Sequence, residues 1–227
     1  MLTQFAGAAP PAISALNGIL YLAAGAVFDW DPEAIVLSNG LPYPAQTVTW
    51  SATSGATVAS PSTSTDSNGI AWTQVISGAL AAGGVSTVNA CLAGGVPNGK
   101  GCTEFTIVGD DPSTAGLISI SGTSQTLGPT DVLAPAILGV VDSSGNPLAG
   151  AQVSFYQTLR QWAPPCPAQG SCPPAPVLAT QTVQAVSGAN GSVTLNPLTD
   201  GIVATQLEVL AVTGSSATLT ISVDRHP

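Results

Sequence analysis

Charged side chains are scarce in this chain of 227 residues, making up 7% of it, against about 25% in an average soluble domain. Lys and Arg together number three, while Asp and Glu number 12, which gives a formal charge of −9. Nucleic-acid binding depends on cations that displace the counterions around phosphate, so this composition excludes it. An acidic membrane surface would repel the chain for the same reason, and the chain is too poor in Lys and Glu to line amphipathic helices.

Histidine is almost absent, because His226 is the only imidazole of the chain. A catalytic triad needs a base within hydrogen-bond reach of its nucleophile, and a residue next to the C-terminus is poorly placed for that role. The glutamates are Glu33, Glu104 and Glu208. The last two fall in predicted strands, where outward-facing carboxylates are usual, so paired-acid chemistry is not indicated. We expect a protein that is not an enzyme.

Long uninterrupted apolar runs are missing too. Residues 1–28 are apolar, but no Lys or Arg precedes them, and Pro and Gly residues interrupt them. This is not the pattern of a signal peptide, so we expect a mature start or a fragment of a larger protein. The stretch Ile19–Phe28 is too short to span a bilayer, and no membrane insertion is expected.

Gly, Pro, Ser and Thr are abundant, and hydrophobic residues make up 44% of the chain. Val48 and Trp50 alternate with polar residues, as do Val153 and Phe155, and residues 218–223 alternate throughout. Alternation with period two predicts half-buried strands, and no helical stripe is present. The fold class predicted is all-β, built as a sandwich.

The chain repeats itself once. Pro42 aligns with Pro147, and Val48 with Val153, at one constant offset. Asn-Gly at 68–69 parallels Asn-Gly at 190–191 at a larger offset, and both pairs are typical of the turn that precedes a strand. The added residues of the second copy fall around a Pro-rich segment, 161–176, which has the composition of a surface loop.

We therefore predict two tandem immunoglobulin-like β-sandwiches. The divisions expected are an N-terminal extension 1–14, a first domain 15–109, a linker 110–114, and a second domain 115–227 that carries the loop insert 161–176.

The motif from Gly145 to Phe155, Gly-Asn-Pro-Leu-Ala-Gly-Ala-Gln-Val-Ser-Phe, is followed by Ala-Asn-Gly-Ser-Val-Thr-Leu at 189–195. This pair resembles the bacterial Ig-like domains of the invasin and intimin type. The second copy carries the resemblance more clearly than the first, where Trp50 stands in place of the Phe. The resemblance implies stalk segments of bacterial surface adhesins, and it specifies a fold more strongly than a function.

The four cysteines form two pairs that are close in sequence, Cys91 with Cys102 and Cys166 with Cys172. Their spacings differ from those of zinc knuckles, so we predict two local disulfides, with a metal site as the alternative. Disulfides place the protein in an oxidising compartment, and we expect a secreted or cell-surface bacterial protein.

No cofactor is predicted, and calcium is the candidate metal. Calcium binds several oxygen ligands in flexible loops. The candidate ligands are two groups of acids, the first near the N-terminus and the second in the linker: Asp29, Asp31, Glu33, Asp110 and Asp111. The alternative is that these carboxylates are simply solvated.

Two tryptophans are candidate contact residues for a protein or a glycan. The inward set of the strand after Gly69 should be Ala71, Thr73 and Val75, which leaves Ile70 and Trp72 pointing outward. Trp162, with Arg160, stands beside the Cys166 loop. The alternatives are that a neighbouring segment covers Trp72, and that Trp162 holds the insert onto its own sandwich.

The leading prediction for function is a non-catalytic structural or adhesive module that acts as a stalk or spacer and contacts a partner. Two alternatives stay open. In one, the apolar segment 12–28 adds a strand to a neighbouring subunit and builds an extracellular filament, instead of completing its own sandwich. In the other, the chain is a carbohydrate-binding accessory module.

Overall fold

The chain folds almost entirely into β-strands, as the computed structural model shows for residues 10–95, 101–128, 130–161, 175–199, 205–215 and 217–225. The one helical element of these residues is a single 3-10 turn, Pro112–Thr114. The all-β prediction is confirmed. No helix in the described ranges is long and apolar enough to cross a membrane. The chain divides into two compact units, residues 1–110 and 111–227.

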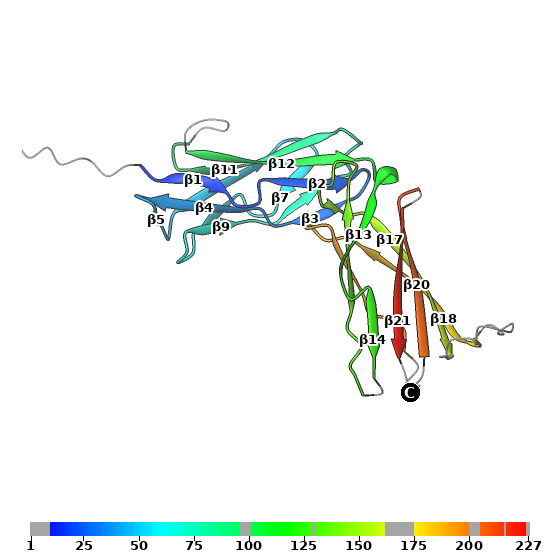
Figure 1. The fold of residues 1–227 in the computed structure, drawn as a ribbon. Helices are drawn as coiled ribbons and strands as arrows, with labels where there is room; N and C mark the ends of the chain where they lie inside the picture. The colour runs from blue at the N-terminus through cyan, green and yellow to red at the C-terminus, as the bar shows by residue number, and fades with distance from the viewer. Residues whose placement is uncertain are drawn as a thin grey trace, which may run out of the picture. The chain divides into compact units, whose positions relative to one another are not determined.

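Unit 1 is a two-layered sandwich (Figure 1). In chain order its strands are β1 (Ala12–Ala15), β2 (Ile19–Ala23), β3 (Phe28–Trp30), β4 (Glu33–Ser38), β5 (Leu41–Pro42), β6 (Thr47–Ala52), β7 (Ala56–Val58), β8 (Ser62–Ser64), β9 (Ile70–Trp72), β10 (Val75–Ser77), β11 (Val85–Leu92) and β12 (Cys102–Asp110). One layer holds β4 between β1 and β9, and β10 between β3 and β7. The other layer runs β2-β12-β11-β6-β8.

Unit 2 repeats the main part of this connectivity. Its strands are β13 (Gly116–Ser121), β14 (Ser124–Leu127), β15 (Ala136–Val141), β16 (Leu148–Ala149), β17 (Gln152–Gln161), β18 (Val177–Val186), β19 (Ser192–Leu195), β20 (Thr205–Thr213) and β21 (Ala217–Arg225). One layer runs β13-β15-β19, and the other runs β14-β21-β20-β17-β18. In each unit an early strand pairs in parallel with the last strand, β2 with β12 and β14 with β21.

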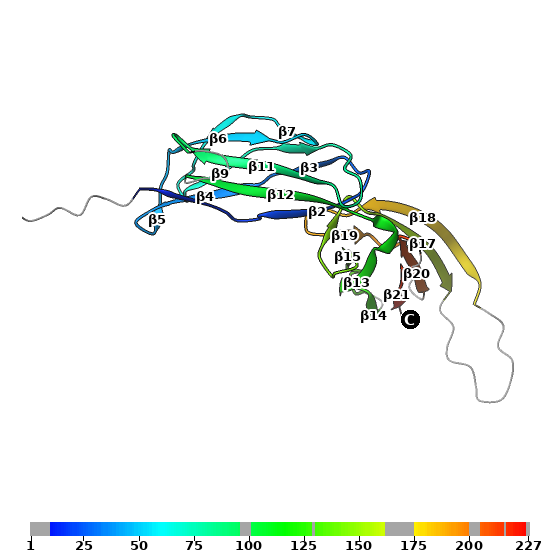
Figure 2. The same ribbon diagram turned by 90° about the horizontal axis from the view of Figure 1, so that it is seen from above.

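The two copies differ most in one hairpin. The pair β6 and β8 of unit 1 corresponds to β17 and β18 of unit 2, where both strands reach ten residues. Figure 2 shows this long hairpin leaving the body of its sandwich. Of the predicted loop insert 161–176, only Gln161 belongs to a described strand, as the last residue of β17, and its N–H donates a hydrogen bond of 3.0 Å to the Pro176 carbonyl. Residues 162–174 lie outside the described ranges.

The N-terminal segment is used inside its own sandwich. β1 begins at Ala12, so the expected extension 1–14 includes the start of the first strand, which pairs antiparallel with β4. β2 completes the opposite layer. The expected linker 110–114 is not open chain either, since β12 extends to Asp110 and the 3-10 turn follows at Pro112.

Aromatic side chains form the centre of the core in unit 1. The Trp30 ring meets the Phe105 ring edge-on with centroids 5.9 Å apart, and the centroid of the Trp50 ring lies 5.8 Å from that of Phe105. Trp50 Nε1 donates a hydrogen bond to Thr63 Oγ1 at 2.7 Å, which satisfies the one polar atom of this buried ring. The prediction that Trp50 belongs to the core is confirmed. Phe155 occupies the equivalent position in unit 2 and is fully buried.

A glycine at the same place in both units fixes the register of the short layer. Gly69 and Gly191 both have positive φ, and a Cβ on either would lie within 2.6 Å of a carbonyl oxygen, that of Val36 or of Val140. Their own carbonyls accept hydrogen bonds of 2.8 Å from the N–H groups of the same two valines. Only a residue without a side chain allows this approach of backbone to backbone.

Replacing this glycine should therefore lower the free energy of unfolding far more than replacing a glycine in an open turn. Gly191→Ala should lower the free energy of unfolding by about 3 kcal/mol, because left-handed φ and overpacking both penalise it. Gly145→Ala is the matched control, since Gly145 also has positive φ but nothing within 4 Å of the added Cβ, and it should cost about 1 kcal/mol. Denaturant unfolding monitored by circular dichroism measures both. Equal losses would contradict the close approach.

A second turn in unit 2 is organised by one carboxylate. Asp142 Oδ1 accepts hydrogen bonds of 2.8 Å from the N–H groups of Ser144 and Asn146, and Oδ2 accepts one of 2.8 Å from Asn146 Nδ2. Partial burial of the Asp142 carboxyl raises its pKa, but the hydrogen bonds from Asn146, Ser144 and Gly145 outweigh that effect, so the pKa lies below its usual value.

This turn should make stability depend on pH. The pKa of the Asp142 carboxyl is lower in the folded protein than in the unfolded chain, where it is about 4. The stabilisation is therefore fully present above about pH 4 and is lost as the pH falls through the pKa of the folded state. Asp142→Ala should lower the free energy of unfolding by about 2 kcal/mol at neutral pH. This difference in unfolding free energy between variant and parent should become smaller in acid. Ser144→Ala, which keeps the backbone donor, is the control. A pH-independent difference in unfolding free energy would count against this account.

Candidate functional site

The strand that follows Gly69 places one large aromatic side chain in solvent. Ala71, Thr73 and Val75 are buried, whereas Trp72 is 56% exposed and Ile70 is partly exposed. The predicted orientation of this strand is confirmed. No described segment covers Trp72, and β1, which could have done so, instead pairs with the far side of β4.

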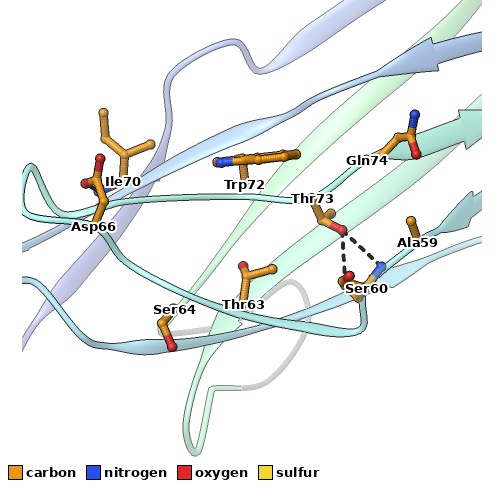
Figure 3. Close-up of a pocket in the computed structure, with 9 residues that line it drawn as sticks. All are labelled: Ala59, Ser60, Thr63, Ser64, Asp66, Ile70, Trp72, Thr73 and Gln74. Atoms are coloured by element: carbon orange, nitrogen blue, oxygen red, sulfur yellow. Dashed lines mark hydrogen bonds between the residues drawn. The ribbon is translucent and has the colours of Figure 1, made fainter.

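Trp72 borders a groove of about 450 Å³, hereafter the Trp72 groove (Figure 3). The groove lies between β9 with the residues that follow it and the segment made of β8 and the connection from β7 to β8. Its lining residues are Ala59, Ser60, Thr63, Ser64, Asp66, Ile70, Trp72, Thr73 and Gln74. Figure 3 shows the indole extending along the strand above Thr63 and Ser64, with Asp66 beside Ile70 at one end and Gln74 at the other.

Hydrogen bonds hold both walls of the groove in place. Thr73 Oγ1 donates to the Ser60 carbonyl at 3.1 Å and accepts from the Ser60 N–H at 3.2 Å, which ties the connection between β7 and β8 to the residue that follows β9. At the other end, Asp66 Oδ1 accepts from the N–H groups of Asn68 and Ile70 at 2.8 and 2.9 Å. The groove is therefore formed by ordered turns, and its shape is set before any ligand arrives.

The chemistry of the groove combines one flat apolar surface with several polar groups. Ser60, Thr63 and Ser64 bring hydroxyls that both donate and accept hydrogen bonds, Asp66 brings a carboxylate, and Gln74 brings an amide. An exposed indole offers a large rigid surface to a ligand at a small cost in conformational entropy. Such a set suits a ligand that has an apolar face and a polar rim.

The outer face of this layer extends the apolar surface next to the groove. Ile35 stands opposite Ile70 in the ladder, and Glu33 stands opposite Trp72. Ile76, on the next strand β10, is 42% exposed but does not line the groove. Cross-strand neighbours of this kind lie within contact distance of each other on one face of a sheet.

The second pair of candidate contact residues is only partly described. Arg160 is partly buried, and its Nη1 donates to the Ala175 carbonyl at 3.2 Å across the long hairpin. Arg160 also lines a shallow groove of about 320 Å³ together with Glu208. Trp162 lies outside the described ranges, and a contact role for either residue stays a prediction.

The acidic candidates for calcium are spread over several elements. Asp29 and Glu33 are exposed on β3 and β4, and Asp31 is exposed between them. Asp111 caps the 3-10 turn, and the N–H of Ser113 lowers the pKa of this carboxyl. Within the described parts of the chain, no three side chains from Asp, Glu, His or Cys converge as a metal site would require.

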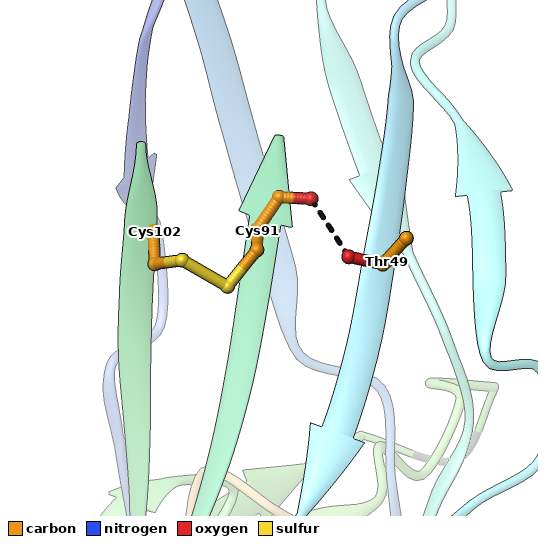
Figure 4. Close-up of a disulfide and its surroundings, with 3 residues drawn as sticks. All are labelled: Thr49, Cys91 and Cys102. Carbon is orange, nitrogen blue, oxygen red and sulfur yellow. Dashed lines mark hydrogen bonds between the residues drawn. A yellow bond between two sulfur atoms is a disulfide. The ribbon is translucent and has the colours of Figure 1, made fainter. Parts of the chain in front are cut away.

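One predicted disulfide is present. Cys91 on β11 and Cys102 on β12 stand opposite each other in the ladder with Cα atoms 4.0 Å apart, and their sulfurs are bonded (Figure 4). Thr49 Oγ1 on β6 donates to the Cys91 carbonyl at 3.2 Å. This bridge joins neighbouring strands of one layer, so it does not connect the two layers. Cys166 and Cys172 lie outside the described ranges.

Sequence reasoning identified Trp72 and Ile70 but missed the rest of the groove. Ser60, Thr63 and Ser64 are common residue types in a Ser- and Thr-rich segment, and nothing in the sequence places them opposite Trp72. Asp66 carried a readable signal, because Asp two residues before Asn-Gly is typical of a turn closed by its own side chain.

No protein-family model matches the chain, and no curated protein matches it in sequence. Several solved structures are similar to it. The D0–D1 domain of intimin is 18% identical with a TM-score of 0.34, and the match covers 94% of this chain and 95% of that one. The adhesin InvE of Yersinia pseudotuberculosis is 16% identical with a TM-score of 0.31, over 95% of this chain and 58% of that one.

Invasin, described as a bacterial integrin-binding protein, is 17% identical with a TM-score of 0.34, over 96% of this chain and 39% of that one. Intimin and invasin domains are thus among the structures that resemble this chain, as the sequence motifs predicted. At such low identities and TM-scores the likeness concerns the fold, and no function is transferred from these proteins.

The disulfide should stabilise unit 1 modestly, because it closes a loop with a sequence separation of 11. The double variant Cys91→Ala/Cys102→Ala should lose about 2 kcal/mol of unfolding free energy. Alkylation of the unreduced protein followed by peptide mass measurement provides the chemical check: neither thiol should be labelled. Labelling of Cys91 or Cys102 without reductant would rule the bridge out.

Proposed function

We propose that the chain is a non-catalytic structural and adhesive module of a secreted or cell-surface bacterial protein. Its two sandwiches act as a spacer, and the Trp72 groove is the surface that contacts a partner. The observation that carries the proposal is a 56% exposed indole beside a groove lined by hydroxyl, carboxylate and amide groups.

The ligand class that fits this groove is a carbohydrate. A sugar ring presents C–H groups on its faces and hydroxyls around its rim, so it can stack on the indole while its hydroxyls meet Ser60, Ser64 or Asp66. The rest of the chain supports a binding role over a catalytic one, since it has a single histidine and few charged groups. The disulfide between Cys91 and Cys102 supports an oxidising, extracellular location.

The proposal predicts that sugar binding depends on Trp72. The purified chain should bind a subset of glycans on an array, and Trp72→Ala should weaken the Kd for the best of them at least about tenfold, which corresponds to about 1.4 kcal/mol. Isothermal titration with the soluble glycan gives the Kd. Quenching of tryptophan fluorescence should accompany binding in the parent and be lost in the variant.

Ile76→Ala is the matched control, because Ile76 is an exposed apolar residue close by in the chain, on β10, but outside the groove. It should leave the Kd unchanged. Equal weakening by both variants, or glycan binding that survives Trp72→Ala, would remove the groove from the proposal. Absence of glycan binding together with Trp72-dependent adhesion to protein-coated surfaces would assign the groove to a protein partner instead.

A further inference from the structure

The outermost strand of unit 2 has a free edge. In the layer β14-β21-β20-β17-β18, the strand β18 pairs with β17 on one side, and no other described strand pairs with it on the other. At ten residues, β18 is as long as β17 and longer than every described edge strand of unit 1. An edge of this length presents a row of unpaired N–H and C=O groups to solvent.

The hydrogen bonds at the two ends of the hairpin show which groups face that edge. The Ser187 N–H donates to the Ala151 carbonyl at 3.0 Å, and the Gln161 N–H donates to the Pro176 carbonyl at 3.0 Å. Backbone groups alternate in direction along a strand, and the bulge between Val177 and Ala179 shifts that alternation by one residue, so both hydrogen bonds agree. From Ala179 to Ala185 the odd-numbered residues therefore bond to β17, and the N–H and C=O groups of Thr180, Thr182 and Gln184 point to the open side.

β18 lacks most of the features that protect other edges from pairing. Its sequence, Val177-Leu-Ala-Thr-Gln-Thr-Val-Gln-Ala-Val186, contains no charge, no Pro and no Gly. The corresponding edge in unit 1 is guarded, because β8 has only three residues and follows Pro61. In the other layer of unit 1, β5 has two residues and ends at Pro42. The one irregularity of β18 is a bulge at its start, opposite Leu159 and Arg160. Short strands, Pro and charge are the usual means of blocking edge pairing.

The sequence of β18 is also complementary to itself. Antiparallel pairing about a two-fold axis at Thr182 brings Thr180 opposite Gln184 and Thr182 opposite its own copy, and these are the residues whose backbone groups face outward. On the other face the same register brings Ala179 opposite Ala185 and Gln181 opposite Val183. The two side chains of every pair lie on the same face of the sheet, as a continuous sheet requires, and no pair places like charges opposite each other.

We propose that β18 is a self-association surface: two copies of the chain pair antiparallel along this edge, centred on Thr182, and form one continuous sheet. This association goes beyond the adhesive role proposed above and uses a different unit of the chain from the Trp72 groove. Isologous pairing of this kind produces a closed dimer. It would present two grooves on one particle.

Charge outside the edge should tune the association. The chain carries a formal charge of −9, so two copies repel each other at a distance, while the edge itself is neutral. Because salt screens the repulsion between exposed charges and leaves backbone hydrogen bonds in place, the dimer should be favoured as ionic strength rises.

Sedimentation velocity over a concentration series, combined with amide hydrogen exchange read by NMR, tests the proposal. The parent should show a monomer–dimer equilibrium. The amides of Thr180, Thr182 and Gln184 should exchange rapidly when dilute and become protected as the dimer forms, whereas those of Gln181 and Val183 should be protected throughout. Thr182→Lys should shift the sample to monomer, because two ammonium groups would face each other at the axis.

Thr220→Lys is the matched control, since it adds the same charge to an exposed position on the same face of the layer, on β21 rather than on the edge. It should leave the dimer intact, and circular dichroism should show both variants folded. A parent that stays monomeric up to its solubility limit, in low and high salt, would overturn the proposal. So would a dimer that survives Thr182→Lys or that leaves the three outward amides unprotected.

Discussion

The placement of the strand after each Asn-Gly turn depends on one backbone contact, in which a glycine lies against the valine of the neighbouring strand. The N–H of Val36 reaches the Gly69 carbonyl, and the N–H of Val140 reaches the Gly191 carbonyl, both at 2.8 Å. A slip of one residue in a strand turns every side chain to the opposite face. This contact therefore decides that Ala71 and Val75 enter the core while Trp72 stays in solvent, and without it there would be no aromatic surface beside the groove.

Much of this could be read from the sequence, because the determining features are local. Alternation around Val48 and Val153, and the Asn-Gly pairs at 68 and 190, predicted strands, turns and the duplication of the fold. The orientation of Trp72 followed from comparison of the two copies. What could not be read depends on contacts between distant segments: Ser60 meets Thr73, and the strands β2 and β14 pair in parallel with the last strand of their own unit. The type of residue at one end of such a contact does not reveal which distant residue it will meet.

The two copies illustrate how one framework acquires different surfaces. In unit 1 the corresponding hairpin is short, and β8 with the connection before it borders the groove opposite Trp72. In unit 2 the hairpin is extended on both sides, and its second strand becomes a long edge. The cores beneath are equivalent, with Trp50 and Phe155 at matching positions. Changes in the length of one hairpin thus alter what each sandwich can contact while the buried residues keep their places.

The parallel pairing of β2 with β12 determines how unit 1 would respond to mechanical load. Ile19–Ala23 runs alongside Thr106–Asp110 in the same direction, so tension applied to the two ends of this unit pulls the strands past each other lengthwise. The hydrogen bonds of a ladder loaded in this way bear the tension together, whereas bonds loaded from one end would open one after another. The same arrangement recurs at Ser124–Leu127 and Ser222–Arg225 in unit 2. Each sandwich thereby contains one pair of parallel strands whose hydrogen bonds resist tension together.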